Sequence, residues 1–393
     1  MILIIIVFSL MHRRTLLELL SVPLLTRYSL KAAKQDRIVI AGAGIMGASI
    51  AYHLARRGAN VTVLERTRPG SGATQNSFAW LNATFSKQPR SYYELNLAGI
   101  AGWRRLCLDF PELRVQWGGS VQWYTPGPRA DRLRTSVASH AGWGYWVHQI
   151  DASEIPRLIP GIAPGPVGAA CFAELEGTVD PMHALGVFLL HAQTMGVGVE
   201  YPCEVTQISR SNGRVTGVET TRGPFPCDFL VLASGVDTER LARTVDVSVP
   251  LKDSPGALAH TQPHARLLDR IALAPGANIK QNPDGRIVTG TDFGPAPEKN
   301  PGREFGLGLL ANAGRFLSRI NEAELETVTL GHRVLPKDDL PIVGFAPTCP
   351  NLYIAAMHSG MTLSPLIGQV AAMEILDGAE VDLLQPYRPS RFA

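Results

Sequence analysis

Residues 38–66, IVIAGAGIMGASIAYHLARRGANVTVLER, decide the fold of the first part of the chain. The apolar start predicts a short buried strand that ends at glycines, and Met46, Ile50 and Leu54 then repeat at helical spacing. Gly58 ends this helix, and residues 60–65 form a second apolar run. The stretch therefore predicts one strand–helix–strand unit of about 30 residues.

Three glycines at the end of the first strand, Gly42, Gly44 and Gly47, have the spacing of a dinucleotide-binding turn. The first permits the turn, the second lets backbone approach a pyrophosphate, and the third lets the helix pack on the strand. The helix N-terminus offers N–H groups to phosphates. Glu65 ends the second strand, where its carboxylate can accept hydrogen bonds from ribose hydroxyls. The pattern indicates an adenine dinucleotide and leaves NAD and FAD undecided.

The bulk composition of the 393 residues is that of a globular protein of one large or two moderate domains. A net charge of only +3, with no basic run between aromatic residues, gives no case for a nucleic-acid partner. The five cysteines are scattered without a Cys-x-x-Cys pair, so neither a zinc site nor a disulfide framework is expected.

Residues 1–35 are excluded from the fold prediction as an N-terminal extension. Their first apolar run is shorter than the ~20 residues that span a bilayer, and Arg13-Arg14 precede a Leu-rich stretch. A twin-arginine export signal, an organelle presequence and an upstream start codon all fit. The localisation is therefore left open between the cytoplasm, export and an organelle, and no membrane association is expected beyond this segment.

Several later stretches predict local structure. Asp180 and Pro181 form the N-cap and first position of a helix to about residue 196, and Asn212-Gly213 predict a hairpin turn. Residues 229–235 read as a strand buried in a parallel sheet. Residues 80–146 hold all six tryptophans, and 249–330 are Pro-rich and strand-like. The alternation predicts two domains that the chain crosses more than once.

Two further stretches carry chemistry. The small residues of SGAT, 71–74, predict a turn at which backbone approaches a second part of a cofactor, and Arg66 before it can contact the pyrophosphate or the adenine edge. Arg333 lies in an apolar, Pro-bounded stretch, where a buried guanidinium needs an anion. A substrate carboxylate is one such anion. A structural ion pair with Asp338 or Asp339 is the other interpretation.

The chain as a whole resembles the FAD-dependent oxidoreductases of the D-amino-acid oxidase class, which includes glycine oxidase, sarcosine oxidase and D-amino-acid dehydrogenases. The resemblance covers residues 36 to about 388. It rests on six stretches in order, which are the glycine turn unit, SGAT, GTVDP (177–181), VLASG (231–235), GHRVLPKDDLPIVG (331–344) and IAAMHSGMTLSPLIG (354–368).

This resemblance implies an α/β fold with a glutathione-reductase-like, Rossmann-type FAD domain and an antiparallel substrate-binding sheet. The expected FAD domain comprises residues 36–88, 154–247 and 331–388, and the expected substrate-binding domain comprises 89–153 and 248–330. The expected FAD-binding residues are Gly42, Ala43, Gly44, Ile45, Met46, Gly47, Glu65, Arg66, Gly72, Ala73, Thr74, Val205, Gly235, Ser359, Gly360, Met361, Thr362 and Leu363. Residues 358–363 are expected as a turn beside the flavin, followed by a helix from about Pro365.

The resemblance also assigns a role to Arg333, which matches the arginine that holds the substrate carboxylate. It places His358 in the turn beside the flavin, where it is expected as a flavin-contact residue; a catalytic base and a core histidine are the other interpretations. Two departures stand out. Ser359-Gly360 replace a second arginine found in glycine-oxidase-like members, and no cysteine lies within ten residues of Gly331, where sarcosine-oxidase members attach flavin. FAD is therefore expected to bind noncovalently.

The expected reaction is oxidation of a C–N bond in a small amino acid or secondary amine. Hydride would pass to flavin N5, water would hydrolyse the imine, and oxygen, a quinone or another acceptor would reoxidise the flavin. The alternatives are an NAD-dependent two-domain dehydrogenase and a flavin-stabilised binding or scaffold protein without turnover.

Overall fold

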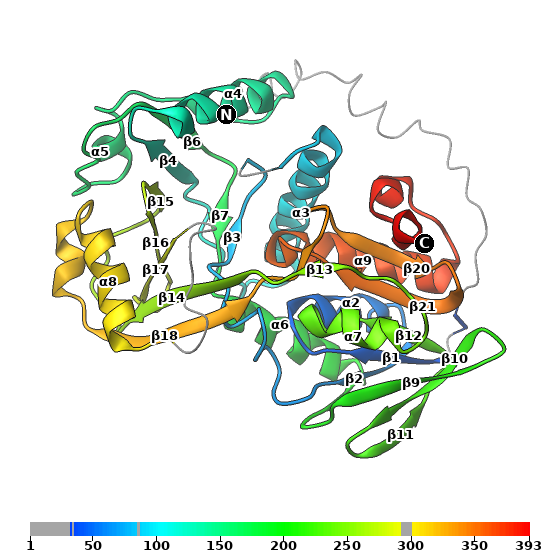
Figure 1. Cartoon of the computed structure of the whole chain (residues 1–393). Coiled ribbons are helices and arrows are strands. Elements are labelled where there is room, and N and C mark those ends of the chain that lie inside the picture. Colours follow the sequence, from blue (N-terminus) through cyan, green and yellow to red (C-terminus); the bar gives the residue numbers. More distant parts are fainter. Residues whose placement is uncertain (1–31, 34, 85–86, 292–300) are drawn as a thin grey trace, which may run out of the picture.

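A computed structural model describes residues 32–33, 35–84, 87–291 and 301–393 (Figure 1). These residues form a mixed α/β fold around two large sheets, which confirms the predicted fold class. The expected targeting segment lies outside the described residues up to residue 31. Ala32 is buried, and its N–H donates to Ile375 O over 2.6 Å. None of the described helices is both long and apolar enough to span a membrane.

A six-stranded sheet forms around the predicted strand–helix–strand unit. Its strands are parallel except for the edge strand β20, which runs antiparallel to β21. In spatial order they are β20 (Ile342–Ala346), β21 (Cys349–Ala356), β12 (Phe229–Leu232), β1 (Arg37–Ala41), β2 (Asn60–Leu64) and β8 (Gly198–Glu200).

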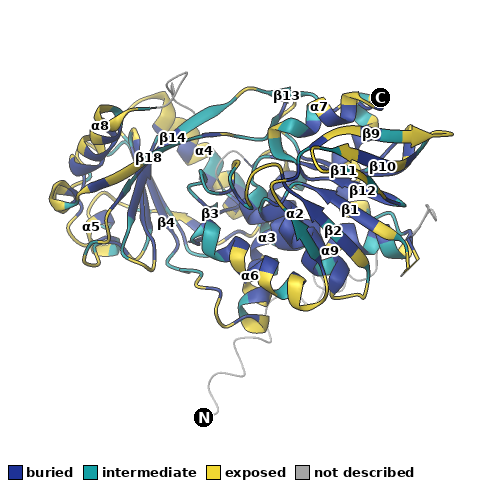
Figure 2. Cartoon of the chain, turned by 90° about the horizontal axis from the view of Figure 1, so that it is seen from below, coloured by how far each residue is buried: buried dark blue, intermediate teal, exposed yellow. Residues whose placement is uncertain are grey.

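Helices cover one face of this sheet and a small antiparallel sheet covers the other. Ile38 and Ile40 of β1 pack on the helices, whereas Val39 and Ala41 pack on the other layer, because successive strand residues point to opposite faces. Figure 2 shows β1, β2 and β12 buried between these layers. The helices are α2 (Ile45–Ala55), α3 (Arg90–Asp109), α6 (Pro181–Thr194) and α9 (Gly360–Asp377), and the other layer holds β11 (Gly223–Pro226), β10 (Arg214–Thr220), β9 (Val205–Ser211), η2 (Gly235–Asp237) and α7 (Thr238–Arg243).

An eight-stranded sheet forms the second lobe, on the left in Figure 1. Its order is β18 (Leu325–His332), β14 (Pro255–Thr261), β17 (Ile287–Gly290), β16 (Ala277–Gln281), β15 (Ile271–Ala274), β4 (Ser120–Tyr124), β6 (Ala169–Ala173) and β5 (Val147–Gln149). The pairs are antiparallel apart from β15 with β4, which are parallel. The helices against it are α4 (Pro128–Gly142), α5 (Ile155–Leu158) and α8 (Arg303–Gly314), with η3 (Ser318–Glu322) nearby.

Two short ribbons connect the lobes, namely β3 (Trp80–Leu81) with β7 (Gly177–Thr178) and β13 (Leu251–Lys252) with β19 (Leu335–Pro336). The turns η4 (Asp382–Tyr387) and η5 (Pro389–Phe392) end the chain beside β20. One stretch differs from the expected division. Residues 169–173 were expected in the FAD domain, but they pair with β4 and β5 in the eight-stranded sheet. We therefore propose that residues 154–173 belong to the substrate-binding domain.

Several local predictions are confirmed. Asp180 caps α6, its carboxylate accepting hydrogen bonds from the N–H groups of Met182 and His183 at 2.8 Å each. Asn212-Gly213 turn between β9 and β10, and β12 lies between parallel neighbours.

The start of the last helix was predicted wrongly. Helix α9 begins at Gly360, so Pro365 lies inside it. A proline has no N–H to donate to the carbonyl four residues earlier. That carbonyl, Met361 O, instead accepts from the indole N–H of Trp103 on α3, at 2.7 Å. A partner from another helix thus satisfies the freed acceptor and lets the helix continue.

Candidate active site

A cavity of about 830 Å³ opens at the carboxyl ends of the parallel strands β1, β2 and β12. In open parallel sheets, this edge is where ligands bind. The cavity wall runs from the glycine turn after β1 to the end of β18 and the start of α9. It therefore joins the predicted dinucleotide turn to Arg333 and His358, which lie some 290 or more residues further along the chain.

The glycine turn leaves no room for side chains. Gly42 has a φ of +106°, and a Cβ there would lie 2.5 Å from Ala233 O at the end of β12. A Cβ at Gly47 would lie only 1.9 Å from Gly42 O, because the first turn of α2 packs directly on the loop. These contacts give the first and third glycines the packing roles that the sequence predicts.

Gly47→Ala is expected to displace the start of α2 from the loop. Overpacking of this kind costs about 1–3 kcal/mol, and the FAD content of the purified protein should fall with it. Gly186→Ala is the matched control, since Gly186 lies within α6 and an added Cβ would meet nothing within 4 Å. Absorbance at 450 nm per protein and the urea midpoint measure both effects. Equal values for the two variants would contradict the assigned packing role.

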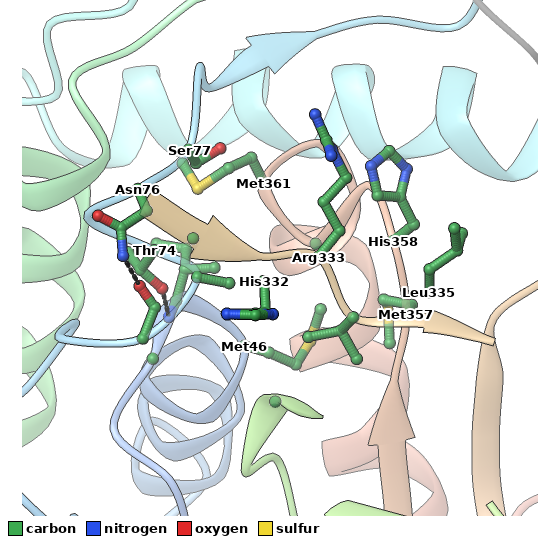
Figure 3. A pocket seen from close by; sticks show the side chains of 18 of the residues that line it. Met46, Thr74, Asn76, Ser77, His332, Arg333, Leu335, Met357, His358 and Met361 are labelled. Atoms are coloured by element: carbon green, nitrogen blue, oxygen red, sulfur yellow. Dashed lines mark hydrogen bonds between the residues drawn. The ribbon is translucent and has the colours of Figure 1, made fainter. Parts of the chain in front are cut away.

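Side chains beyond the turn hold the loop around the N-terminus of α2. Glu65 Oε2 accepts from the N–H of Ala43 at 3.0 Å, so this carboxylate already supports the turn that it lies beside. Thr74 Oγ1 accepts from the N–H of Ile45 at 3.0 Å (Figure 3). The 71–74 turn and the glycine turn therefore form one continuous wall of the cavity.

Arg333 and His358 lie beside each other at the far end of the cavity (Figure 3). The guanidinium lies against Gly256 of β14, where a Cβ would be 2.6 Å from Nη2, and Nη1 donates to Pro255 O at 2.5 Å. The two aspartates considered as partners form other ion pairs, Asp338 with Arg391 and Asp339 with Lys252, each at 2.7 Å.

The imidazole of His358 is neutral at physiological pH. Its pKa is lowered to about 3, mainly by burial and in smaller part by the neighbouring Lys87 and Arg333 side chains. A group with this pKa can accept or donate a hydrogen bond at pH 7 but carries no charge. The far end of the cavity therefore holds a half-buried guanidinium beside an uncharged ring.

Most of the predicted site residues line this cavity. They are Arg333 and His358, together with Gly42, Gly44, Ile45, Met46, Glu65, Arg66, Gly72, Ala73, Thr74, Val205, Gly235, Ser359, Gly360 and Met361. Four predicted residues are not on its wall. Ala43 and Gly47 face the protein interior, Leu363 is fully buried, and the hydroxyl of Thr362 donates to Trp80 O at 3.3 Å. The last two point inward because α9 has already begun at Gly360.

Three residues that are not among the predicted site residues, Lys87, Tyr92 and Trp80, also line the cavity. Lys87 is only 3% exposed, and its Nζ donates a hydrogen bond to Ser359 Oγ. It stands in the polar stretch SKQPR, which looks like a solvent-exposed loop in the sequence. No local signal marks it, because its partner lies 272 residues away.

The described residues fit an adenine dinucleotide that carries a second ring system. Glycines line the cavity at Gly42, Gly44 and Gly72, and an added Cβ at Gly72 would meet nothing within 4 Å, so backbone is open to a ligand there. The N-terminus of α2 supplies the anion-binding end for a pyrophosphate. The cavity wall also includes the start of α9 and Arg333, so the cavity is longer than a site for the pyrophosphate alone would need to be.

Comparisons with known proteins show which sequences and folds this chain is similar to. The chain is 27% identical over 350 residues to glycine oxidase of Geobacillus kaustophilus, covering 85% of this chain and 91% of that protein. It is 26% identical over 367 residues to the bifunctional protein ThiO/ThiG of Synechocystis, and it spans only 54% of that longer protein.

Solved structures show the same fold. The crystal structure of the Geobacillus kaustophilus glycine oxidase superposes with a TM-score of 0.84 at 25% identity, covering 91% of this chain and 99% of the other. L-proline dehydrogenase from P. horikoshii superposes with a TM-score of 0.82 at 22% identity, covering 92% and 98%.

The family described as "DAO: FAD dependent oxidoreductase" matches residues 37–373, which is most of the chain. This match decides the question that the glycine turn left open between NAD and FAD, and it does not support the NAD-dependent alternative. The protein is an enzyme that belongs to the DAO family of FAD-dependent oxidoreductases.

Proposed function

We propose that this enzyme oxidises a C–N bond of a small amino acid or secondary amine that carries a carboxylate. The observation that supports this proposal is the pairing of Arg333 with a neutral His358 in one cavity that extends from the dinucleotide turn. A guanidinium binds a carboxylate through two parallel hydrogen bonds, which fixes both the position and the orientation of the substrate. FAD, when bound, accepts the two electrons and the hydrogen that leave the carbon beside nitrogen, and water then hydrolyses the resulting imine.

The chain's own residues would bind and orient the reactants. The backbone of the glycine turn and the N-terminus of α2 would hold the pyrophosphate, and Glu65 and Arg66 would lie beside the adenosine half. Val205, Gly235 and the first residues of α9 also line the cavity. His358, uncharged at neutral pH, would contact the flavin and would add no second positive charge beside the amine.

We propose that FAD binds without a thioether link. The five cysteines are free thiols, and none lies on the cavity wall formed by the described residues. Denaturing and precipitating the holoenzyme should therefore leave the yellow colour in the supernatant. Colour retained by the pellet would contradict this expectation, and the supernatant spectrum at 450 nm measures it.

The reaction is tested by mixing the holoenzyme anaerobically with a panel of amino acids and N-methylated amines. Loss of the 450 nm absorbance identifies the substrates, and the matching amines that lack a carboxylate should be at least about tenfold poorer because they cannot pair with Arg333. Reoxidation by oxygen and by a soluble quinone then identifies the acceptor. A protein that no member of the panel bleaches would be a binding or scaffold protein, and the proposed reaction would be wrong.

A further inference from the structure

Lys87 is a buried amine at the wall of the proposed active site. It is 3% exposed, and Nζ donates to Ser359 Oγ, which also accepts from Tyr92 Oη at 3.1 Å. Nζ lies 5.0 Å from the centre of the Tyr92 ring. Within the part of the chain that the structure describes, Lys87 forms no ion pair, and the hydroxyl of Ser359 is the acceptor of its hydrogen bond.

The ionisable groups around Lys87 come from four elements. Tyr92 lies on α3, His358 precedes α9, Arg333 follows β18, and Glu176 precedes β7. Burial lowers the pKa of Lys87 to about 7, and the charge of Glu176 raises it only in part. The phenol of Tyr92, with a pKa of about 12, and the imidazole of His358, with a pKa of about 3, are both neutral at pH 7.

The acid whose charge acts on Lys87, Glu176, is already hydrogen-bonded by other groups. Glu176 is fully buried, and its carboxylate accepts from the indole N–H of Trp80, the N–H groups of Ala83 and Thr84, and the hydroxyls of Thr84 and Ser120. It therefore serves the 80–84 segment rather than Lys87. A lysine without an ion-pairing carboxylate, in a cavity that opens to a ligand, can remain an uncharged amine.

Given the proposed function, we propose that Lys87 accepts the proton that the substrate's ammonium group must lose before the C–N bond is oxidised. An amino acid enters as a zwitterion, and its ammonium nitrogen has no lone pair to support loss of hydrogen from the adjacent carbon. One N–H bond of the substrate breaks, its electron pair stays on the substrate nitrogen, and a new N–H bond forms on Nζ. Lys87 then carries the positive charge, and FAD serves as the oxidant.

The substrate itself favours this transfer. Its carboxylate, bound at Arg333, brings a negative charge into a cavity in which opposite charges are screened weakly. A negative charge raises the pKa of a neighbouring amine. Binding therefore increases the proton affinity of Lys87 at the moment when the substrate has a proton to lose, and the proton returns to solvent after the product leaves.

The pH dependence of flavin reduction tests the assignment. With the best amino acid of the panel, the second-order rate constant of anaerobic flavin reduction should fall tenfold per pH unit below about 7, where free Lys87 is protonated. In Lys87→Met, this rate constant should be at least about 100-fold lower than in the wild type at pH 7. The rate of this variant should rise tenfold per pH unit up to the pKa of the free substrate amine, because only the deprotonated substrate reacts.

The variant Lys87→Arg distinguishes a role of Lys87 as a base from a role as a positive charge. Arginine keeps the charge, but it does not lose its proton. This variant should behave like Lys87→Met, and a near-wild-type rate with an unmoved pH profile would overturn the proposal. Lys280→Met is the matched control. Lys280 is another buried lysine with a pKa of about 7, but it donates to Thr178 Oγ1 and Val179 O and is absent from the described cavity wall. Its pH profile should match the wild type.

A readout without turnover completes the test. Propanoate has the carboxylate of a substrate but no amine, so it can bind without reacting. It is added to each variant at pH 8.5, and the change in the flavin spectrum measures its binding. The wild type should take up a proton when it binds propanoate, seen as a pH rise in weakly buffered solution, whereas Lys87→Met should take up none. Equal uptake by both would refute the role of Lys87. Failure of the wild type to be bleached by any amine would instead refute the proposed reaction.

Discussion

Arg333→Met is expected to lower kcat/KM for carboxylate substrates by about 100- to 1000-fold, or about 3–4 kcal/mol. The side chain lies against Gly256 and donates to Pro255 O, so the guanidinium is held at the cavity wall before any substrate arrives. Losing it leaves a carboxylate without its partner in a half-buried site. Steady-state kinetics with the best amino acid of the panel measure the effect.

Two controls make the result specific to the carboxylate. Arg333→Lys keeps the charge but not the paired donors, so it should recover only part of the loss. Amines without a carboxylate should change less than about threefold in both variants, with unchanged FAD content. If Arg333→Met left the apparent affinity for the best carboxylate substrate unchanged, the assigned role of Arg333 would be wrong.

Glu374→Gln is expected to cost about 3–5 kcal/mol of unfolding free energy, the largest stability effect expected here. Glu374 is 1% exposed in α9, and both of its oxygens accept from Arg388, at 2.9 Å and 2.5 Å. The hydroxyl of Tyr353 donates to the same carboxylate at 2.8 Å. The substitution leaves Arg388, only 7% exposed, with the more distant Glu380, at 3.8 Å from Nε, as its remaining carboxylate.

Asp377→Asn is the matched control, because Asp377 lies in the same helix and pairs with Arg57 at the surface. An exposed pair contributes at most about 1 kcal/mol. Urea unfolding of the FAD-loaded proteins compares the two. The double variant Glu374→Leu/Arg388→Met should recover most of the lost stability, since it removes the charge as well as its partner. Equal stability of the two single variants would contradict the assignment.

The sequence predicted correctly those features that depend on interactions between residues close together in the chain. The glycine turn, the cap of Asp180 and the 212–213 hairpin depend on backbone conformation over a few residues, and each is found where it was expected. The sequence also brought Arg333 and His358 to one site, but only through the resemblance to a family. No spacing or periodicity in the chain itself places them together.

The errors occurred where distant segments meet. Helix α9 begins five residues before the predicted start because Trp103 of another helix supplies a donor to Met361 O. Residues 169–173, which we propose to assign to the substrate-binding domain, form a five-residue strand, and such a strand carries no mark of the sheet that it will join. In both cases the partner lies far away in the sequence, so no local pattern could report it.

What the sequence determined by itself is a dinucleotide turn on a parallel sheet, since φ angles and alternating burial are properties of short segments. What only the tertiary structure decided is the chemistry at the other end of the cavity. Lys87 stands in a stretch that looks solvent-exposed, yet folding places its amine on Ser359 and buries it. The charge of such a group depends on every element packed around it, and burial of a lysine is set by long-range packing rather than by its neighbours in the chain.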